Sequence, residues 1–188
     1  MSARAETRIR LAVPADAPAI ADVRVTAWRT TYRGIIPDSY LDAMKVEDSA
    51  TLWEKILTAA PNTTNTFVAE ADGRVVGFAS GMMKTEAPLG FDAELTGIYL
   101  VQDAQRAGVG KRLVAAVAAA QRAHGATAMI AWVIASNKAA RAFYERLGGE
   151  LVVEQPFTWD GMDLVEAGYG WHDLPALMAA GGDPHALH

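Results

Sequence analysis

One short stretch, residues 105–111 (Gln-Arg-Ala-Gly-Val-Gly-Lys), constrains the fold of this chain most strongly because it joins a predicted strand to a predicted helix. Residues 94–101 before it are typical of a strand, and residues 109–124 after it have helical spacing. A tight turn here leaves unpaired backbone N–H groups in the first turn of the helix, where the helix dipole also favours an anion. Arg106 and Lys111 add positive charge. The stretch therefore predicts a phosphate-binding loop.

Two common phosphate loops do not fit this spacing. A nucleotide P-loop requires a glycine where this chain has Gln105, and a hydroxyl residue where it has Arg112. A dinucleotide-binding fingerprint requires a third glycine where this chain has Leu113. The sequence therefore supports neither a magnesium-nucleotide site nor a dinucleotide site.

The remaining pattern, Gln-x-x-Gly-x-Gly, resembles the pyrophosphate loop of the GCN5-related N-acetyltransferase (GNAT) family. In that family the loop holds the diphosphate of acetyl-CoA, so the resemblance implies acetyl-CoA as co-substrate. Gly108 and Gly110 would permit the close approach or the dihedral angles that such a loop needs. The loop residues expected to bind the co-substrate are Gln105, Arg106, Ala107, Gly108, Val109, Gly110 and Lys111.

The composition narrows the class of protein. The 188 residues, 51% of them hydrophobic, suit a single domain over 1–188, with a core at about 7–172 and a tail at 173–188. The absence of cysteine excludes disulfides, thiolate zinc sites and a cysteine nucleophile, and the four histidines lack the spacing of a metal site. A net charge of -5 argues against a nucleic-acid partner. No window is apolar enough for a membrane span or a signal peptide, so we expect a cytoplasmic protein.

Periodicity and chain breakers predict a strand, two helices, three strands, a helix, a strand, a helix and two strands. Strands are expected at 7–13, 66–71, 74–82, 94–101, 127–135, 151–155 and 162–171, and helices at 16–32, around 52–57, at 109–124 and at 137–147. This order is similar to that of the GNAT family. The resemblance implies an α/β fold whose mixed, mostly antiparallel sheet splays between its fourth and fifth strands, with helices on both faces.

A second segment, residues 137–148, resembles the family's Asn-x-x-Ala-x-x-x-Tyr-x-x-x-Gly pattern. The resemblance implies that Tyr144 lies near the CoA sulfur and acts as the general acid. The structural alternative is a half-buried helix tyrosine that packs its ring and keeps its hydroxyl in water. Asn137 is a good helix cap, and by resemblance it also contacts the pantetheine or acetyl end of the co-substrate.

The strand before the loop carries the remaining candidates. Glu94 precedes Ile98 by four residues and is therefore expected on the same strand face. In several family members a glutamate at the matching position takes the proton of the amine, whereas the structural alternative is a solvated strand-end residue. Other members place a base on the following strand, where this chain has Trp132. By resemblance, the backbone of Ile98, Tyr99 and Leu100 would bind pantetheine in the splay.

These residues predict an N-acetyltransferase that moves the acetyl group of acetyl-CoA to a primary amine by direct attack in a ternary complex. The acceptor would be a small-molecule or peptide amine, and an aromatic and acidic pocket would favour a cationic one. The aromatic and acidic candidates are Trp28, Tyr32, Trp53 and Trp159 with Asp42, Glu86, Asp92 and Asp160. One alternative is an acyl-CoA-binding sensor, which would need neither Tyr144 nor Glu94. Another is an interaction module that pairs two chains through the last strands, and a homodimer remains open.

Overall fold

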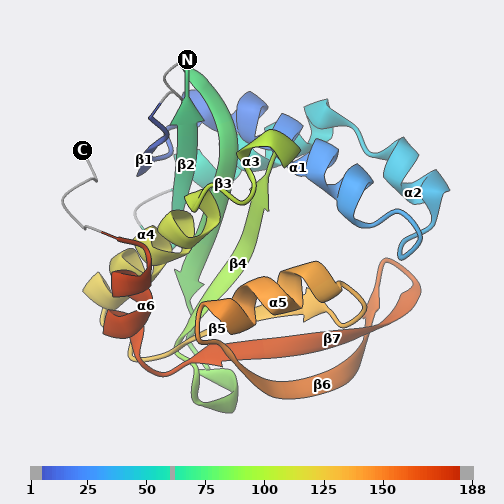
Figure 1. The fold of residues 1–188 in the computed structure, drawn as a ribbon. Helices are drawn as coiled ribbons and strands as arrows, with labels where there is room; N and C mark the ends of the chain where they lie inside the picture. The colour runs from blue at the N-terminus through green and yellow to red at the C-terminus, as the bar shows by residue number, and fades with distance from the viewer. Residues whose placement is uncertain (1–5, 60–61, 183–188) are drawn as a thin grey trace.

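The computed structural model describes residues 6–59 and 62–182. Seven strands form one sheet in the order β1-β2-β3-β4-β5-β7-β6, and helices lie against it (Figure 1). The strands are β1 (Arg8–Leu11), β2 (Asn65–Ala71), β3 (Arg74–Met83), β4 (Ala93–Leu100), β5 (Met129–Ile134), β6 (Glu150–Trp159) and β7 (Met162–Trp171). All neighbouring strands are antiparallel except β4 and β5, which are parallel. The predicted mixed, mostly antiparallel sheet is confirmed.

The helices differ from the prediction in two places. They are α1 (Ala17–Thr31), α2 (Asp38–Ala43), α3 (Val46–Thr58), α4 (Val109–Ala123), α5 (Lys138–Arg146) and α6 (Leu174–Ala180), with short 3-10 segments η1 (Pro14–Asp16), η2 (Pro88–Gly90) and η3 (Gln102–Ala104). The single helical region expected after α1 is two helices, α2 and α3. Residues 174–180, assigned to a tail, form α6, which Asp173 caps and which buries Leu174 and Leu177. Residues 183–188 of that tail lie outside the described residues.

The last hairpin is longer than predicted. β6 continues to Trp159, although the sequence indicated a strand ending at 155. Pro156 lies inside β6, opposite Val165 of β7. Proline is tolerated there because β6 is the edge strand of the sheet, where a missing N–H need not break a ladder. The extension carries Trp159 toward α1 and α2, at the right of Figure 1.

Both faces of the sheet are covered, as predicted. On one face α4 buries Leu113 and Val117 against the strands, together with α5 and α6. On the other face α1 and α3 bury Ile20, Val23 and Trp53 against Phe78 of β3. The apolar stripes that predicted α1 and α4 therefore face the sheet from opposite sides.

The sheet opens between β4 and β5. These strands pair only at Ala93, Glu94 and Leu95, opposite Met129, Ile130 and Ala131. Beyond that point β5 stays paired with β7 along its whole length, whereas β4 follows β3. Figure 1 shows β4 rising away from β5. The predicted splay is confirmed.

A β-bulge lies in β4 at the start of the splay. Ser80 of β3 pairs with Gly97, and Gly81 pairs with Leu95, so Thr96 is an extra residue. The Thr96 hydroxyl donates to the Ser80 carbonyl at 3.0 Å. The extra residue reverses which side chains face which side of the sheet beyond it.

The bulge overturns one prediction. Leu95 and Ile98 both pack in the cluster on the α4 face, so Glu94, next to Leu95, points to the opposite face. Tyr99 packs on that opposite face, with Phe78. Glu94 therefore shares a face with Tyr99 and not with Ile98, because an inserted residue changes the parity that strand alternation assumes.

Candidate active site

The predicted phosphate loop is shaped to expose backbone donors. Arg106 has a φ of 62° and Gly108 a φ of 77°, so the chain turns sharply before α4 begins at Val109. Gly108 is the N-cap of α4 and has no side chain to cap the helix. The N–H groups of the first turn consequently point away from α4 without an intrahelical acceptor, at the positive end of its dipole. This geometry suits a diphosphate.

The two glycines of the loop have different structural roles. Gly108 adopts the left-handed conformation that side chains disfavour. Gly110 has no such φ, but a Cβ atom there would lie 3.2 Å from two ring carbons of Phe143. Phe143 belongs to α5, so the missing side chain of Gly110 lets the first turn of α4 approach α5 across the splay. The sequence left two reasons open for these glycines, the dihedral angle and close approach. In the structure the dihedral angle explains Gly108, and close approach explains Gly110.

Charge around the loop is available to a ligand. Arg106 and Lys111 are exposed, and neither forms an ion pair within the described ranges 6–59 and 62–182. Arg112, by contrast, donates to the Thr7 carbonyl at 2.8 Å and so secures the start of β1. Gln105 Nε2 donates to the Leu100 carbonyl at 3.3 Å, which ties the loop to the end of β4.

The β5-facing edge of β4 offers backbone hydrogen-bonding groups. Val101 N–H donates to the Val76 carbonyl on β3 at 2.9 Å. Because successive residues of a strand turn their backbone groups to opposite sides, Leu100 and Ile98 turn theirs toward the splay. Tyr99, between them, turns its backbone toward β3. An extended ligand in the splay would therefore meet Ile98 and Leu100 through their backbones and would not meet the backbone of Tyr99.

Tyr144 is a buried residue of α5. Its ring is buried against Phe143, Tyr169 and Trp171, with centroid separations of 5.6, 5.9 and 5.6 Å. Burial raises the pKa of its hydroxyl, and the nearby Tyr99 hydroxyl raises that pKa further. The hydroxyl is consequently protonated at neutral pH and can donate a proton.

The hydroxyls of Tyr99 and Tyr32 interact electrostatically with this hydroxyl, and the Asn137 amide interacts with Tyr32. Together with Tyr144 we call these three residues the tyrosine cluster. The pKa of Tyr32 is raised by burial and by the Tyr99 and Tyr144 hydroxyls, while the Asn137 amide opposes that rise. Asn137 also caps α5, because its Oδ1 accepts from the Ala140 N–H at 3.2 Å. The sequence placed Tyr99 in the site only through its backbone and Tyr32 only in an acceptor pocket.

Tyr32 belongs to a layer of rings on the acceptor side, the aromatic wall, made of Trp28, Tyr32, Tyr40 and Trp159. The Trp28 ring lies 4.8 Å from that of Tyr32 and 5.1 Å from that of Trp159. Tyr40 lies 5.0 Å from Trp159. The wall joins α1 and α2 to the tip of the β6–β7 hairpin. Trp53, proposed for the same pocket, instead packs in the core against Phe78 at 5.0 Å.

Two of the four acids proposed for the acceptor pocket are engaged elsewhere. Asp42 pairs with Arg33, and Asp92 accepts from the backbone N–H groups of Thr127 and Ala128 at 2.9 Å. The other two, Glu86 and Asp160, are exposed. Asp160 follows Trp159 at the turn of the β6–β7 hairpin, so one of these carboxylates lies beside the aromatic wall.

Glu94 stands apart from the tyrosine cluster in its contacts. Its Oε2 lies 3.0 Å from Lys84 Nζ, and its side chain is partly buried. Within the residues described, no hydrogen bond or ion pair links it to Tyr144, Tyr99 or Asn137. The structure brings Tyr144, Asn137 and Tyr99 together and leaves Glu94 on the same face of β4 as Tyr99.

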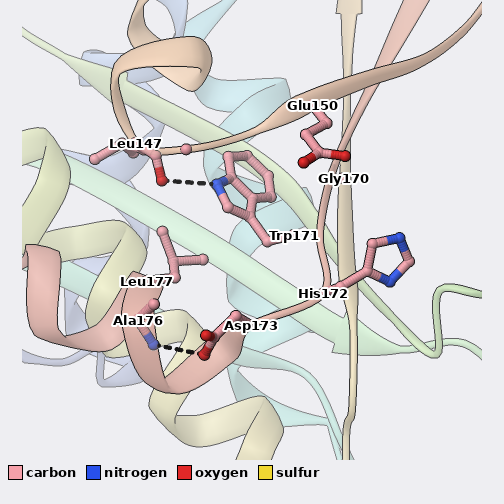
Figure 2. Close-up of a pocket in the computed structure, with 9 residues that line it drawn as sticks. Leu147, Glu150, Gly170, Trp171, His172, Asp173, Ala176 and Leu177 are labelled. Atoms are coloured by element: carbon pink, nitrogen blue, oxygen red, sulfur yellow. Dashed lines mark hydrogen bonds between the residues drawn. The ribbon is translucent and has the colours of Figure 1, made fainter.

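A separate recess lies between α6 and the end of β7 (Figure 2). Two of its polar groups serve the fold, since Trp171 Nε1 donates to the Leu147 carbonyl at 3.1 Å and Asp173 caps α6 by accepting from Ala176 at 2.9 Å. Over the described part of the chain, no group of three or more His, Cys, Asp or Glu side chains could hold a metal ion. No described helix is long and apolar enough to cross a membrane.

Comparisons with known proteins identify the family. Residues 25–149 match the acetyltransferase (GNAT) family. The chain is 39% identical over 171 residues to an uncharacterised N-acetyltransferase of Bacillus subtilis, covering 90% of this chain and 95% of that protein. It is 28% identical over 170 residues to a Mycobacterium tuberculosis protein also named as an N-acetyltransferase, covering 86% and 91%. The fold and the loop thus define an acetyl-CoA-dependent acyltransferase, and the chain belongs to the GNAT family, whose co-substrate is acetyl-CoA.

Solved structures share the fold. The PaiA N-acetyltransferase of Thermoplasma acidophilum, solved with coenzyme A, superposes with a TM-score of 0.66 at 19% identity, over 86% of this chain and 98% of that one. An acetyltransferase of Salmonella typhimurium, solved with acetyl-CoA, gives a TM-score of 0.65 at 21% identity, over 89% and 94%. At these identities the likeness concerns the fold.

Proposed function

We propose that this protein transfers the acetyl group of acetyl-CoA to a primary amine by direct attack in a ternary complex. One observation carries the proposal: the opening between β4 and β5 has a potential anion-binding group at one end and a potential proton donor at the other. The uncapped first turn of α4 lies at one end and the protonated hydroxyl of Tyr144 at the other. Phe143 of α5, beside Gly110, connects them.

Acetyl-CoA binds along this opening. Backbone N–H groups from Arg106 to Lys111, including those of Ala107, Gly108, Val109 and Gly110, hold the diphosphate. Pantetheine runs beside β4, where Ile98 and Leu100 offer their backbone groups. Gln105 orients the loop against β4, and Asn137 lies next to the acetyl end.

In the reaction, the amine nitrogen attacks the thioester carbonyl carbon, a C–N bond forms and the C–S bond breaks. The amine loses one proton and the departing CoA thiolate gains one, so no covalent enzyme intermediate is needed. Tyr144 supplies the proton to the thiolate, since burial keeps its hydroxyl protonated. Glu94 accepts the amine proton through water on the acceptor face of β4, which it shares with Tyr99.

The test is Tyr144→Phe, with the release of free CoA measured across an amine panel and acetyl-CoA affinity measured by calorimetry. Loss of a general acid should lower kcat by about 10²–10⁴-fold with little change in affinity. Tyr169→Phe is the control, because it removes a buried hydroxyl that only bonds Arg141 and Glu145. Acetyl-CoA binding without turnover of any amine would instead favour an acyl-CoA sensor.

A further inference from the structure

Arg24 stands at the acceptor side of the site, one helical turn before Trp28 on α1. Its guanidinium carbon lies 4.8 Å from the centre of the Trp28 ring, and its side chain is partly buried. Trp28 belongs to the aromatic wall, whose other side is Trp159 at the hairpin tip. Arg24 therefore lies beside the surface that an acceptor would contact.

No carboxylate neutralises Arg24 in the described residues, since none lies within ion-pair distance of its guanidinium. Its neighbours in the sequence behave differently. Arg33 pairs with Asp38 and Asp42, and Arg29 donates to the carbonyls of Leu41 and Met44 at 3.0 and 2.6 Å. Arg24 is thus the arginine of α1 and its following loop whose charge is available to a ligand.

A second unpartnered donor lies beside it. Trp28 Nε1 is buried and lacks a hydrogen-bond partner within the described residues, although it is close enough to the Tyr99 hydroxyl to affect the pKa of that group. Because this N–H is enclosed by the protein, of these two donors the Arg24 guanidinium is the one open to a ligand.

Arg24 and Trp28 lie close to the tyrosine cluster. The centre of the Trp28 ring, over which Arg24 lies, is 4.8 Å from the centre of the Tyr32 ring and 6.4 Å from that of the Tyr99 ring. Both tyrosines belong to the cluster that contains Tyr144. An anionic group bound by Arg24 would therefore lie beside this cluster.

We propose that Arg24 binds a carboxylate that the acceptor carries next to its amine, so that the acceptor class is amino acids. The inference rests on the proposed function. A guanidinium binds a carboxylate through two parallel hydrogen bonds, and its single charge matches a monoanion. Two of the acids that could bind a cationic amine are engaged, because Asp42 pairs with Arg33 and Asp92 holds the backbone at Thr127.

The first experiment compares α-amino acids with the amines of the same side chain that lack the carboxylate, using the wild-type protein and Arg24→Met. Methionine keeps the stem over Trp28 and removes the charge. The wild type should favour the carboxylated member of each pair by about tenfold or more in kcat/KM. Arg24→Met should lose that preference through KM for the acceptor, with the KM for acetyl-CoA unchanged. Arg122→Met, an exposed arginine of α4, is the control.

A binding measurement separates this inference from the proposed function. N-acetyl amino acids resemble the product, and they should raise the melting temperature of the CoA-bound wild type but not that of Arg24→Met. Equal shifts in both proteins, no shift in either, or a preference for the amines without carboxylate would each overturn the role of Arg24. Failure of every amine to be acetylated would overturn the proposed function, while the binding result would still decide the role of Arg24.

Discussion

Glu94 and Tyr99 lie on the same face of β4, although strand alternation alone would put them on opposite faces. The extra residue Thr96 at the bulge restores their common side. The bulge also stands where β4 and β5 stop pairing. It therefore places a carboxylate and a tyrosine on the same face of the sheet at the start of the splay.

This arrangement predicts a specific effect of Glu94→Gln. Removal of a general base should lower kcat/KM for the amine by about 10²–10⁴-fold, and acetyl-CoA affinity measured by calorimetry should stay the same. Lys84→Met is the matched control, because it breaks the same ion pair and keeps the carboxylate. Equal losses in both variants would mean that the ion pair supports the fold and that Glu94 is not the base.

Gly110→Leu should weaken acetyl-CoA binding sharply. The new side chain would collide with the Phe143 ring and move the first turn of α4 away from α5. Calorimetry should show a rise in Kd of at least about tenfold, which is about 1.4 kcal/mol. Gly125→Ala is the control for a general loss of stability, since it strains a left-handed glycine at the far end of α4, away from Phe143. An unchanged Kd for Gly110→Leu would mean that this loop does not bind acetyl-CoA.

The burial of Tyr144 predicts that kcat does not fall as the pH becomes alkaline. Burial raises the pKa of Tyr144 above the ordinary tyrosine value of 10.0, so the acid stays protonated throughout the neutral and mildly alkaline range. With the amine fully deprotonated, kcat should therefore not fall as the pH rises toward about 10. A fall near pH 8 that disappears in Tyr144→Phe would contradict this environment.

The ion pair of Arg10 and Asp16 predicts an acid-dependent stability. Hydrogen bonds from the Arg10 guanidinium, at 2.7 and 2.9 Å, lower the pKa of Asp16, although burial opposes the shift. A lowered folded-state pKa contributes stability above the unfolded value near 4, and that contribution is lost as the pH falls through the folded pKa.

Asp16→Asn should therefore destabilise the protein at pH 7 by about 3 kcal/mol, because it leaves the partly buried Arg10 less well paired. The difference from the wild type should shrink below about pH 4. Chemical unfolding at several pH values measures it. Asp42→Asn, in the exposed pair with Arg33, should change little, and a pH-independent loss in Asp16→Asn would indicate a packing effect instead.

The sequence predicted the parts of this fold whose signals are local. The strands expected at 66–71, 74–82 and 127–135 and the helix expected at 109–124 correspond to β2, β3, β5 and α4. The splay followed from the family resemblance. The two segments that carry the site, 105–111 and 137–148, were recognised because their spacing within one loop or one helix is preserved.

The missing parts depend on contacts between distant segments. No local pattern distinguishes Thr96 as an inserted residue, since the bulge is defined by its pairing with Ser80 of β3. The meeting of Tyr32 with Tyr99 likewise depends on how α1 lies across β4. Arg24 has no sequence signal at all, because its significance comes from the absence of a partner in the folded chain. The helix α6 was missed because it has only seven residues, too few to show a helical repeat of apolar positions.

The contact between Gly110 and Phe143 has a mechanical consequence. Phe143 precedes Tyr144 on α5, so the first turn of α4, which we propose binds the diphosphate, packs next to the helix that carries the proposed acid. A tilt of that turn would be transmitted through the Phe143 ring to the Tyr144 backbone. In the proposed function, the separation between the two ends of the co-substrate site therefore depends on this close packing.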